Sequence, residues 1–123
     1  MKITRGHHIS FKHALDGLVY AFVTQPNFRV HTYSATVVLF LGYFLQVSYL
    51  EWLILTLVMF AVFIVELLNT SIEEATDLVV TEHNPTAKAA KDTAAAAVLL
   101  TALGALTVGM LIFGPKLLLI LGI

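Results

Sequence analysis

The sequence contains no cysteine and little charge: of its 123 residues, 12% are charged and 59% are apolar. The absence of cysteine excludes disulfide bonds, thiolate metal sites and thiol catalysis. A soluble domain carries about a quarter charged residues, and a water-soluble fold of this size cannot bury so much apolar surface. The length fits one domain, and the mean hydropathy of +0.88 predicts a membrane protein.

Signals of several other protein classes are also missing. The formal net charge of -1 leaves no basic surface for nucleic acid, so we expect no nucleic-acid partner. Residues 1–16 scatter charged residues where a signal peptide has an apolar segment, so we expect no signal peptide. The sequence has neither a glycine-rich phosphate loop nor a dinucleotide fingerprint. If phosphate is bound, Mg²⁺ held by carboxylates must act together with lysine instead.

Two uncharged stretches near the middle of the chain predict membrane-spanning helices. Residues 32–50 carry no charge over 19 residues, which is about 28 Å as a helix and close to the thickness of one hydrocarbon core. Glu51 and Trp52 are interpreted as a short turn and an interface anchor. The next uncharged stretch has only 14 residues, too short to cross alone, so the second span (52–80) must continue through Glu66.

A third long helix and a surface helix complete the predicted fold. Asn84 is a good N-cap and Pro85 a good first helical residue, so a third membrane-crossing helix is predicted over residues 85–121. Residues 10–25 carry an apolar stripe at helical spacing but are too polar to cross, so they should lie on the membrane surface. The predicted fold class is an all-α membrane protein with three transmembrane helices and one N-terminal amphipathic surface helix.

Basic residues predict the orientation of the chain. Six of them precede the first span or lie between the second and third spans, whereas only Lys116 lies on the other side. The positive-inside rule therefore places the N-terminus in the cytoplasm. Among the six, Arg29 either steers a lipid head group or anchors the chain at the membrane surface. The six residues are Lys2, Arg5, Lys12, Arg29, Lys88 and Lys91.

Four polar residues of the second span share one helix face. At about 100° per residue, an arc of about 80° holds Glu66, Asn69, Glu73 and Asp77. Carboxylates inside a membrane are costly and usually functional. Measured from the outer end of the helix, Glu66 lies about 22 Å inward and Glu73 about 33 Å inward. The stripe can therefore present a lipid hydroxyl at Glu66 and a metal-bound, water-soluble ligand at Glu73.

The start of the third helix supplies complementary charges. Lys88 and Asp92 are four residues apart and form either a helix-stabilising ion pair or part of a site. Lys91 can offset the charge of a phosphate. Because charges in loops are usually just solvated, these residues alone do not indicate a function.

The segment E-L-L-N-T-S-I-E-E-A-T-D at residues 66–77 resembles the core motif of the small bacterial integral-membrane lipid kinases, the prokaryotic diacylglycerol kinase and undecaprenol kinase family. The resemblance covers nearly the whole chain and includes F-K-H-A-L-D-G at residues 11–17. Two further segments, A-K-A-A-K-D at residues 87–92 and N-F-R-V-H at residues 27–31, resemble the undecaprenol kinase branch more closely than the enterobacterial diacylglycerol kinases.

This resemblance implies a homotrimer with active sites at subunit interfaces, and transfer of the ATP γ-phosphate to a lipid hydroxyl. Glu66 matches the catalytic base, Glu73 a metal ligand, and Asn69 and Asp77 polar active-site positions. Gln25 stands where the family often has a metal-holding glutamate. We therefore expect weaker binding of Mg²⁺ or a second ligand from elsewhere, and the other interpretation is impaired activity. The positions that match nucleotide contacts are His13, Glu82, His83, Lys91 and Asp92.

Two other hypotheses stay open at this point. An oligomeric ion channel or metal permease lined by the acidic stripe explains Glu66 and Glu73, but not the Lys91–Asp92 pair or the surface helix. A membrane scaffold whose stripe joins subunits predicts that changing these carboxylates harms assembly rather than chemistry. For a kinase in the bacterial inner membrane, the sequence does not choose between undecaprenol and diacylglycerol as the acceptor.

Overall fold

The computed structural model describes residues 11–123, and every regular element within that range is an α-helix. The described part thus confirms the all-α prediction. The predicted start of the surface helix at Ser10 and the basic residues Lys2 and Arg5 lie outside the described residues. The helices are α1 (Phe11–Thr24), α2 (Pro26–Phe44), α3 (Tyr49–Val79) and α4 (Pro85–Leu121).

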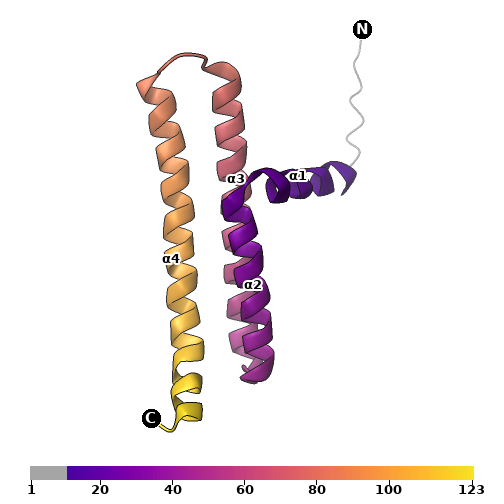
Figure 1. Cartoon of the computed structure of the whole chain (residues 1–123), viewed down its shortest axis with the longest axis vertical. Helices are drawn as coiled ribbons and strands as arrows, with labels where there is room; N and C mark the ends of the chain where they lie inside the picture. Colours follow the sequence, from indigo (N-terminus) through magenta and orange to yellow (C-terminus); the bar gives the residue numbers. More distant parts are fainter. Residues whose placement is uncertain (1–10) are drawn as a thin grey trace.

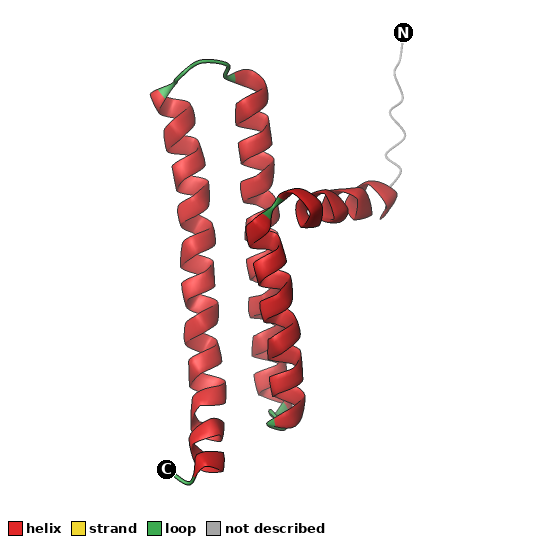
Figure 2. Ribbon diagram, in the orientation of Figure 1, coloured by secondary structure: helices red, strands yellow, loops and turns green. Residues whose placement is uncertain are grey.

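The two long helices, α3 and α4, lie side by side and are joined by a short loop (Figures 1 and 2). The shorter helix α2 runs along one half of α3, and α1 projects sideways from the start of α2 (Figure 1). The α1–α2 corner therefore lies beside the middle of α3. Helices α1 and α2 both lie next to the polar stripe of α3.

The turn between α2 and α3 lies at residues 45–48, so the predicted turn at Glu51 and Trp52 is wrong. The physical reason is a capping box at the start of α3. The Ser48 side chain accepts a hydrogen bond from the Glu51 backbone N–H, and the Glu51 carboxylate accepts one from the Ser48 backbone N–H at 2.6 Å. This reciprocal pair satisfies two backbone donors at the helix terminus and makes Glu51 part of the helix.

The start of α4 also follows from local chemistry. Asn84 Oδ1 accepts hydrogen bonds from the backbone N–H groups of Thr86 and Ala87, at 2.9 and 3.2 Å. Pro85 follows as the first helical residue, where its missing N–H has no cost. These two signals fix the start of the helix that carries Lys91.

Most large apolar side chains are exposed in the single chain, including those on the outer faces of α3 and α4. Both of these helices are long and apolar enough to cross a membrane, with a mean hydropathy of 2.3 over their most apolar windows. Among the described helices, α2 does not meet the same criteria, because its first turns hold the polar run P-N-F-R-V-H. The fold is consistent with an all-α membrane protein.

A close helix–helix contact holds α2 against α3. A Cβ atom built on Gly42 in α2 would lie 2.5 Å from Cη2 of Trp52 in α3, which is far inside normal contact distance. Nearby, the small core of Val47, Leu55, Ile112 and Phe113 packs against the Trp52 ring. Glycine at position 42 therefore allows the rigid indole ring to fill the space between the helices.

Replacing Gly42 with alanine is expected to destabilise the protein by about 1–3 kcal/mol, because the ring and the helices must shift to admit the methyl group. The measurement is the thermal unfolding temperature in a mild detergent. Gly104→Ala is the matched control, since nothing lies within 4 Å of a Cβ atom there. Equal unfolding temperatures for the two variants would contradict the proposed role of this contact.

Candidate functional site

The polar stripe of α3 begins at a fully buried carboxylate. Glu66 is only 1% exposed, and its Oε2 atom has no hydrogen-bond partner among the described residues. Burying an ionisable group without a partner is unfavourable. An unpartnered buried oxygen on a site-forming face therefore indicates that a polar group from outside the single chain belongs next to it.

One turn further along the stripe, an amide and a carboxylate are linked. Asn69 Nδ2 donates a hydrogen bond to Glu73 Oε1 at 3.1 Å, while the buried Asn69 Oδ1 has no partner among the described residues. Glu73 is half-buried, between the buried Glu66 and the exposed Asp77. The stripe thus runs from a buried end at Glu66 to an exposed end at Asp77. Glu66 and Glu73 are separated by about 10 Å of helix rise.

His31 joins this site from α2, although the sequence reasoning did not select it. Its Nε2 atom lies 4.0 Å from Glu66 Oε2, and its side chain is 16% exposed. The sequence contained this residue only as the last letter of N-F-R-V-H. Its proximity to Glu66 arises from the packing of α2 against α3, which no local pattern revealed.

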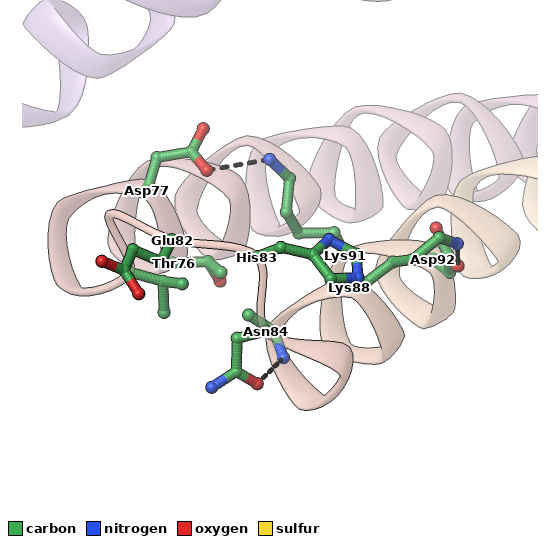
Figure 3. A pocket seen from close by; sticks show the side chains of 10 residues that line it. Thr76, Asp77, Glu82, His83, Asn84, Lys88, Lys91 and Asp92 are labelled. Atoms are coloured by element: carbon green, nitrogen blue, oxygen red, sulfur yellow. Dashed lines mark hydrogen bonds and ion pairs between the residues drawn. The ribbon is translucent and has the colours of Figure 1, made fainter.

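A polar pocket of about 280 Å³ lies at the α3–α4 loop (Figure 3). Lys91 Nζ on α4 pairs with Asp77 Oδ1 on α3 at 2.9 Å, which joins the two helices across the pocket. Glu82 and His83 line it from the loop, and Asp92 lines it from α4. Four of the predicted nucleotide contacts and one polar stripe residue therefore come together here.

A second ion pair lies at this pocket. Lys88 and Asp92 form an ion pair within α4. The first turns of α4 therefore carry one anion, Asp92, and two cations, Lys88 and Lys91. The pocket consequently has the mixed charge that suits a metal-bound polyphosphate, whose anionic oxygens need cations and whose metal needs carboxylates.

The remaining predicted residues lie on α1 and at the start of α2. His13 is on the exposed surface of α1, with Nδ1 4.0 Å from Asp16 Oδ2. Gln25 is the N-cap residue of α2 and is half-buried. Arg29 Nη1 donates hydrogen bonds to the carbonyl oxygens of Phe22 and Val23, at 3.1 and 2.8 Å, so it ties α2 to the end of α1. Its contact with a lipid head group stays a prediction.

A hydrogen bond fixes α1 to α3 beside the stripe. The Tyr20 hydroxyl donates to Glu74 Oε1 at 2.6 Å. This bond to a carboxylate raises the pKa of the Tyr20 phenol, with smaller contributions from burial and from the charge of Glu74. Tyr20 therefore stays protonated and remains a donor at neutral pH, which keeps the surface helix in place next to the site.

A large apolar cavity of about 900 Å³ lies on the other side of His31, between α2, α3 and α4. Its walls are almost entirely apolar, and His31 and Ser34 are among its few polar lining residues. Val62 and Phe63, one turn before Glu66, belong to the same walls. An apolar space thus reaches the histidine next to the buried carboxylate.

Within residues 11–123, no three histidine or acidic side chains come together as a ready-made metal site. Mg²⁺ commonly binds through one or two carboxylates together with phosphate oxygens and water. Glu73, with its single half-buried carboxylate beside the unpartnered Asn69 Oδ1, fits that kind of binding. The donor set suits an ion that arrives with a nucleotide better than a permanently bound one.

Comparisons with known proteins find relatives that are named as lipid kinases. Residues 12–113 match the family model described as prokaryotic diacylglycerol kinase. The chain is 44% identical over 108 residues to the undecaprenol kinase of Bacillus subtilis, covering 88% of each protein. It is 42% identical over 111 residues to the diacylglycerol kinase of Synechocystis, covering 89% of this chain but 63% of that relative. A diacylglycerol kinase of Helicobacter pylori is 42% identical over 85 residues, covering 69% of this chain and 66% of that relative.

Proposed function

The chain belongs to the prokaryotic diacylglycerol kinase family and is a lipid kinase of the membrane, and from this premise we propose that it transfers the γ-phosphoryl group of ATP to the hydroxyl group of a membrane lipid. The observation that carries the proposal is the buried, unpartnered Glu66 Oε2 on the same helix face as Glu73 and Asp77. The relatives' names offer no support for an ion channel.

Glu66 acts as the general base in this proposal. Its Oε2 atom takes the proton of the lipid hydroxyl while the hydroxyl oxygen forms a bond to the γ-phosphorus of ATP. The bond between that phosphorus and the bridging oxygen of ADP breaks, and ADP leaves. The base must lie where the lipid hydroxyl does, and the position of Glu66 within the long apolar helix α3 supports this role.

The cytoplasmic end of the stripe positions the nucleotide. Phosphoryl transfer needs mainly alignment and charge compensation rather than covalent chemistry from the protein. Lys91, held across the pocket by Asp77, offsets phosphate charge, while Glu82, His83 and Asp92 surround the nucleotide. His13 lies on the first turn of α1, away from the residues that line this pocket, and its contact with the nucleotide stays a prediction. Glu73 and Gln25 would hold Mg²⁺, which supplies further charge neutralisation when bound.

We also propose a membrane arrangement for this enzyme. Helices α2, α3 and α4 cross the bacterial inner membrane, with α1 on the cytoplasmic surface and the N-terminus in the cytoplasm. The exposed apolar faces of the single chain support contact with lipid and with two further copies in a homotrimer. Crosslinking in detergent at low protein concentration tests the trimer. Labelling of a single cysteine introduced into the α3–α4 loop by a membrane-impermeant reagent tests the orientation.

The proposed activity is tested in vesicles that contain the purified protein and either undecaprenol or diacylglycerol. With Mg²⁺ and ATP radiolabelled at the γ-phosphate, we expect label in the lipid fraction for at least one acceptor, which also identifies the preferred lipid. Ion flux without ATP consumption and without labelled lipid would instead support the channel.

Replacing Glu73 with glutamine is expected to raise the Mg²⁺ concentration needed for half-maximal activity by about 10- to 100-fold, because a charged ligand becomes neutral. Removing Mg²⁺ with a chelator should abolish the activity of both proteins. The measurement is a Mg²⁺ titration at fixed ATP. Glu74→Gln is the control, since the adjacent side chain instead accepts the Tyr20 hydrogen bond. Equal Mg²⁺ requirements for the two variants would remove Glu73 from the metal site.

A further inference from the structure

His31 on α2 lies beside the unpartnered oxygen of Glu66, and the proposed mechanism does not yet use it. The two atoms, Nε2 and Oε2, are 4.0 Å apart. This separation exceeds the usual hydrogen-bond length by about 1 Å, so the histidine does not satisfy the carboxylate directly. The gap between the two atoms needs another explanation.

The 4.0 Å separation is the spacing that a bridging hydroxyl oxygen would give with normal hydrogen-bond lengths. An oxygen about 2.8 Å from each atom of a pair 4.0 Å apart makes an angle of about 90° between them. An alcohol oxygen can accept a hydrogen bond from an N–H group while its own O–H group donates to a carboxylate. Its second lone pair then remains for attack on phosphorus. The spacing therefore matches a bridging alcohol better than a direct contact.

The position of His31 also connects the carboxylate to the hydrocarbon side of the site. The residue lines the apolar cavity between α2, α3 and α4, whereas Glu66 lies behind it. An alcohol with its hydroxyl at His31 can keep its hydrocarbon chain against these apolar walls. The nucleotide pocket lies in the other direction along α3, at Asp77 and Lys91. His31 thus lies at the boundary between the apolar cavity and the polar stripe of α3.

We propose that His31 orients the hydroxyl group of the acceptor lipid by donating a hydrogen bond from Nε2 to its oxygen, with Glu66 Oε2 accepting the hydroxyl proton. This inference rests on the proposed lipid kinase function and adds a second residue that touches the acceptor. The same bond stabilises the negative charge that develops on the attacking oxygen.

Three substitutions separate this role from a purely structural one. His31→Phe keeps the ring but removes the donor. His31→Gln can place an amide N–H near the position of Nε2, whereas His31→Asn places it near Nδ1. Thr32→Val is the matched control on the same helix, because the Thr32 hydroxyl bonds to the Phe28 carbonyl of its own helix at 2.9 Å.

We expect His31→Phe to lower kcat/KM for the lipid alcohol by about 10- to 100-fold, the value of a hydrogen bond to a charge-bearing group. The KM for ATP should change less than about twofold. His31→Gln should recover most of the loss, His31→Asn should not, and Thr32→Val should behave as wild type. A lipid analogue with hydrogen in place of the hydroxyl should inhibit wild type and His31→Phe equally.

Two results would overturn the inference while leaving the kinase function intact. One is wild-type kcat/KM in His31→Phe. The other is an equal loss in all three His31 variants together with weaker inhibition by the hydroxyl-free analogue, since this pattern indicates a distorted site. If the wild-type protein phosphorylates no lipid alcohol, the proposed function fails and the inference fails with it.

Discussion

Replacing Glu66 with glutamine is expected to lower kcat for lipid phosphorylation by about 10²- to 10⁴-fold, the usual contribution of a general base. Glutamine has nearly the same shape as glutamate, so α3 and its neighbours should keep their packing. It cannot accept the proton of the lipid hydroxyl, however. The KM values for ATP and for the lipid should therefore change much less than kcat, because the substitution removes an interaction of the transition state.

The measurement is steady-state phosphorylation of lipid in vesicles, with thermal unfolding and size analysis of each variant. Glu51→Gln is the control at the opposite end of the same helix, where Glu51 pairs with Lys116 at 3.1 Å. This control should retain activity. Near-normal turnover in Glu66→Gln would remove Glu66 from the base role. Loss of assembly in that variant would instead favour the scaffold hypothesis.

Replacing Lys91 with glutamine is expected to lower kcat/KM for ATP by about 10²- to 10³-fold. The lysine offsets charge on the phosphates, and charge compensation is the main contribution that a protein makes to phosphoryl transfer. The substitution also leaves Asp77 without its cation at the edge of the pocket. An unpaired carboxylate there repels the nucleotide and adds to the loss.

Lys116→Gln separates this effect from loss of helix pairing. Lys116 and Lys91 both lie on α4 and both pair with an acidic residue of α3, but at opposite ends of the helix pair. Each partly exposed ion pair contributes about 0–1 kcal/mol to stability, so both variants should unfold at similar temperatures. Only Lys91→Gln should lose activity with ATP. Equal activity losses would show that Lys91 acts by joining the helices.

Local signals explain which parts of the fold could be predicted from the sequence. Asn84 and Pro85 determine the start of α4 through their own chemistry, and the spacing of Glu66 and Glu73 places them on one face of any helix. The predicted turn after α2 is misplaced because a charged residue such as Glu51, directly after an uncharged stretch, indicates the end of a span. Its three-residue spacing from Ser48 in fact forms a capping box inside the next helix.

Contacts between helices explain what the sequence could not reveal. His31 approaches Glu66 because α2 packs against α3, as the close contact of Gly42 with Trp52 also shows. The charge of Arg29 suggests contact with a lipid head group. In the structure its side chain donates hydrogen bonds to backbone carbonyl groups at the end of α1. Both observations depend on the angle between two helices, which residue spacing within one helix does not encode.

The central claim is that the lipid hydroxyl and the nucleotide meet on one face of α3 and that the phosphoryl group passes directly between them. The most direct measurement uses ATP made chiral at its γ-phosphorus with three oxygen isotopes, followed by stereochemical analysis of the phosphorylated lipid. Direct in-line attack by the hydroxyl oxygen predicts inversion at phosphorus. Retention would require a phosphorylated enzyme intermediate and would contradict the account.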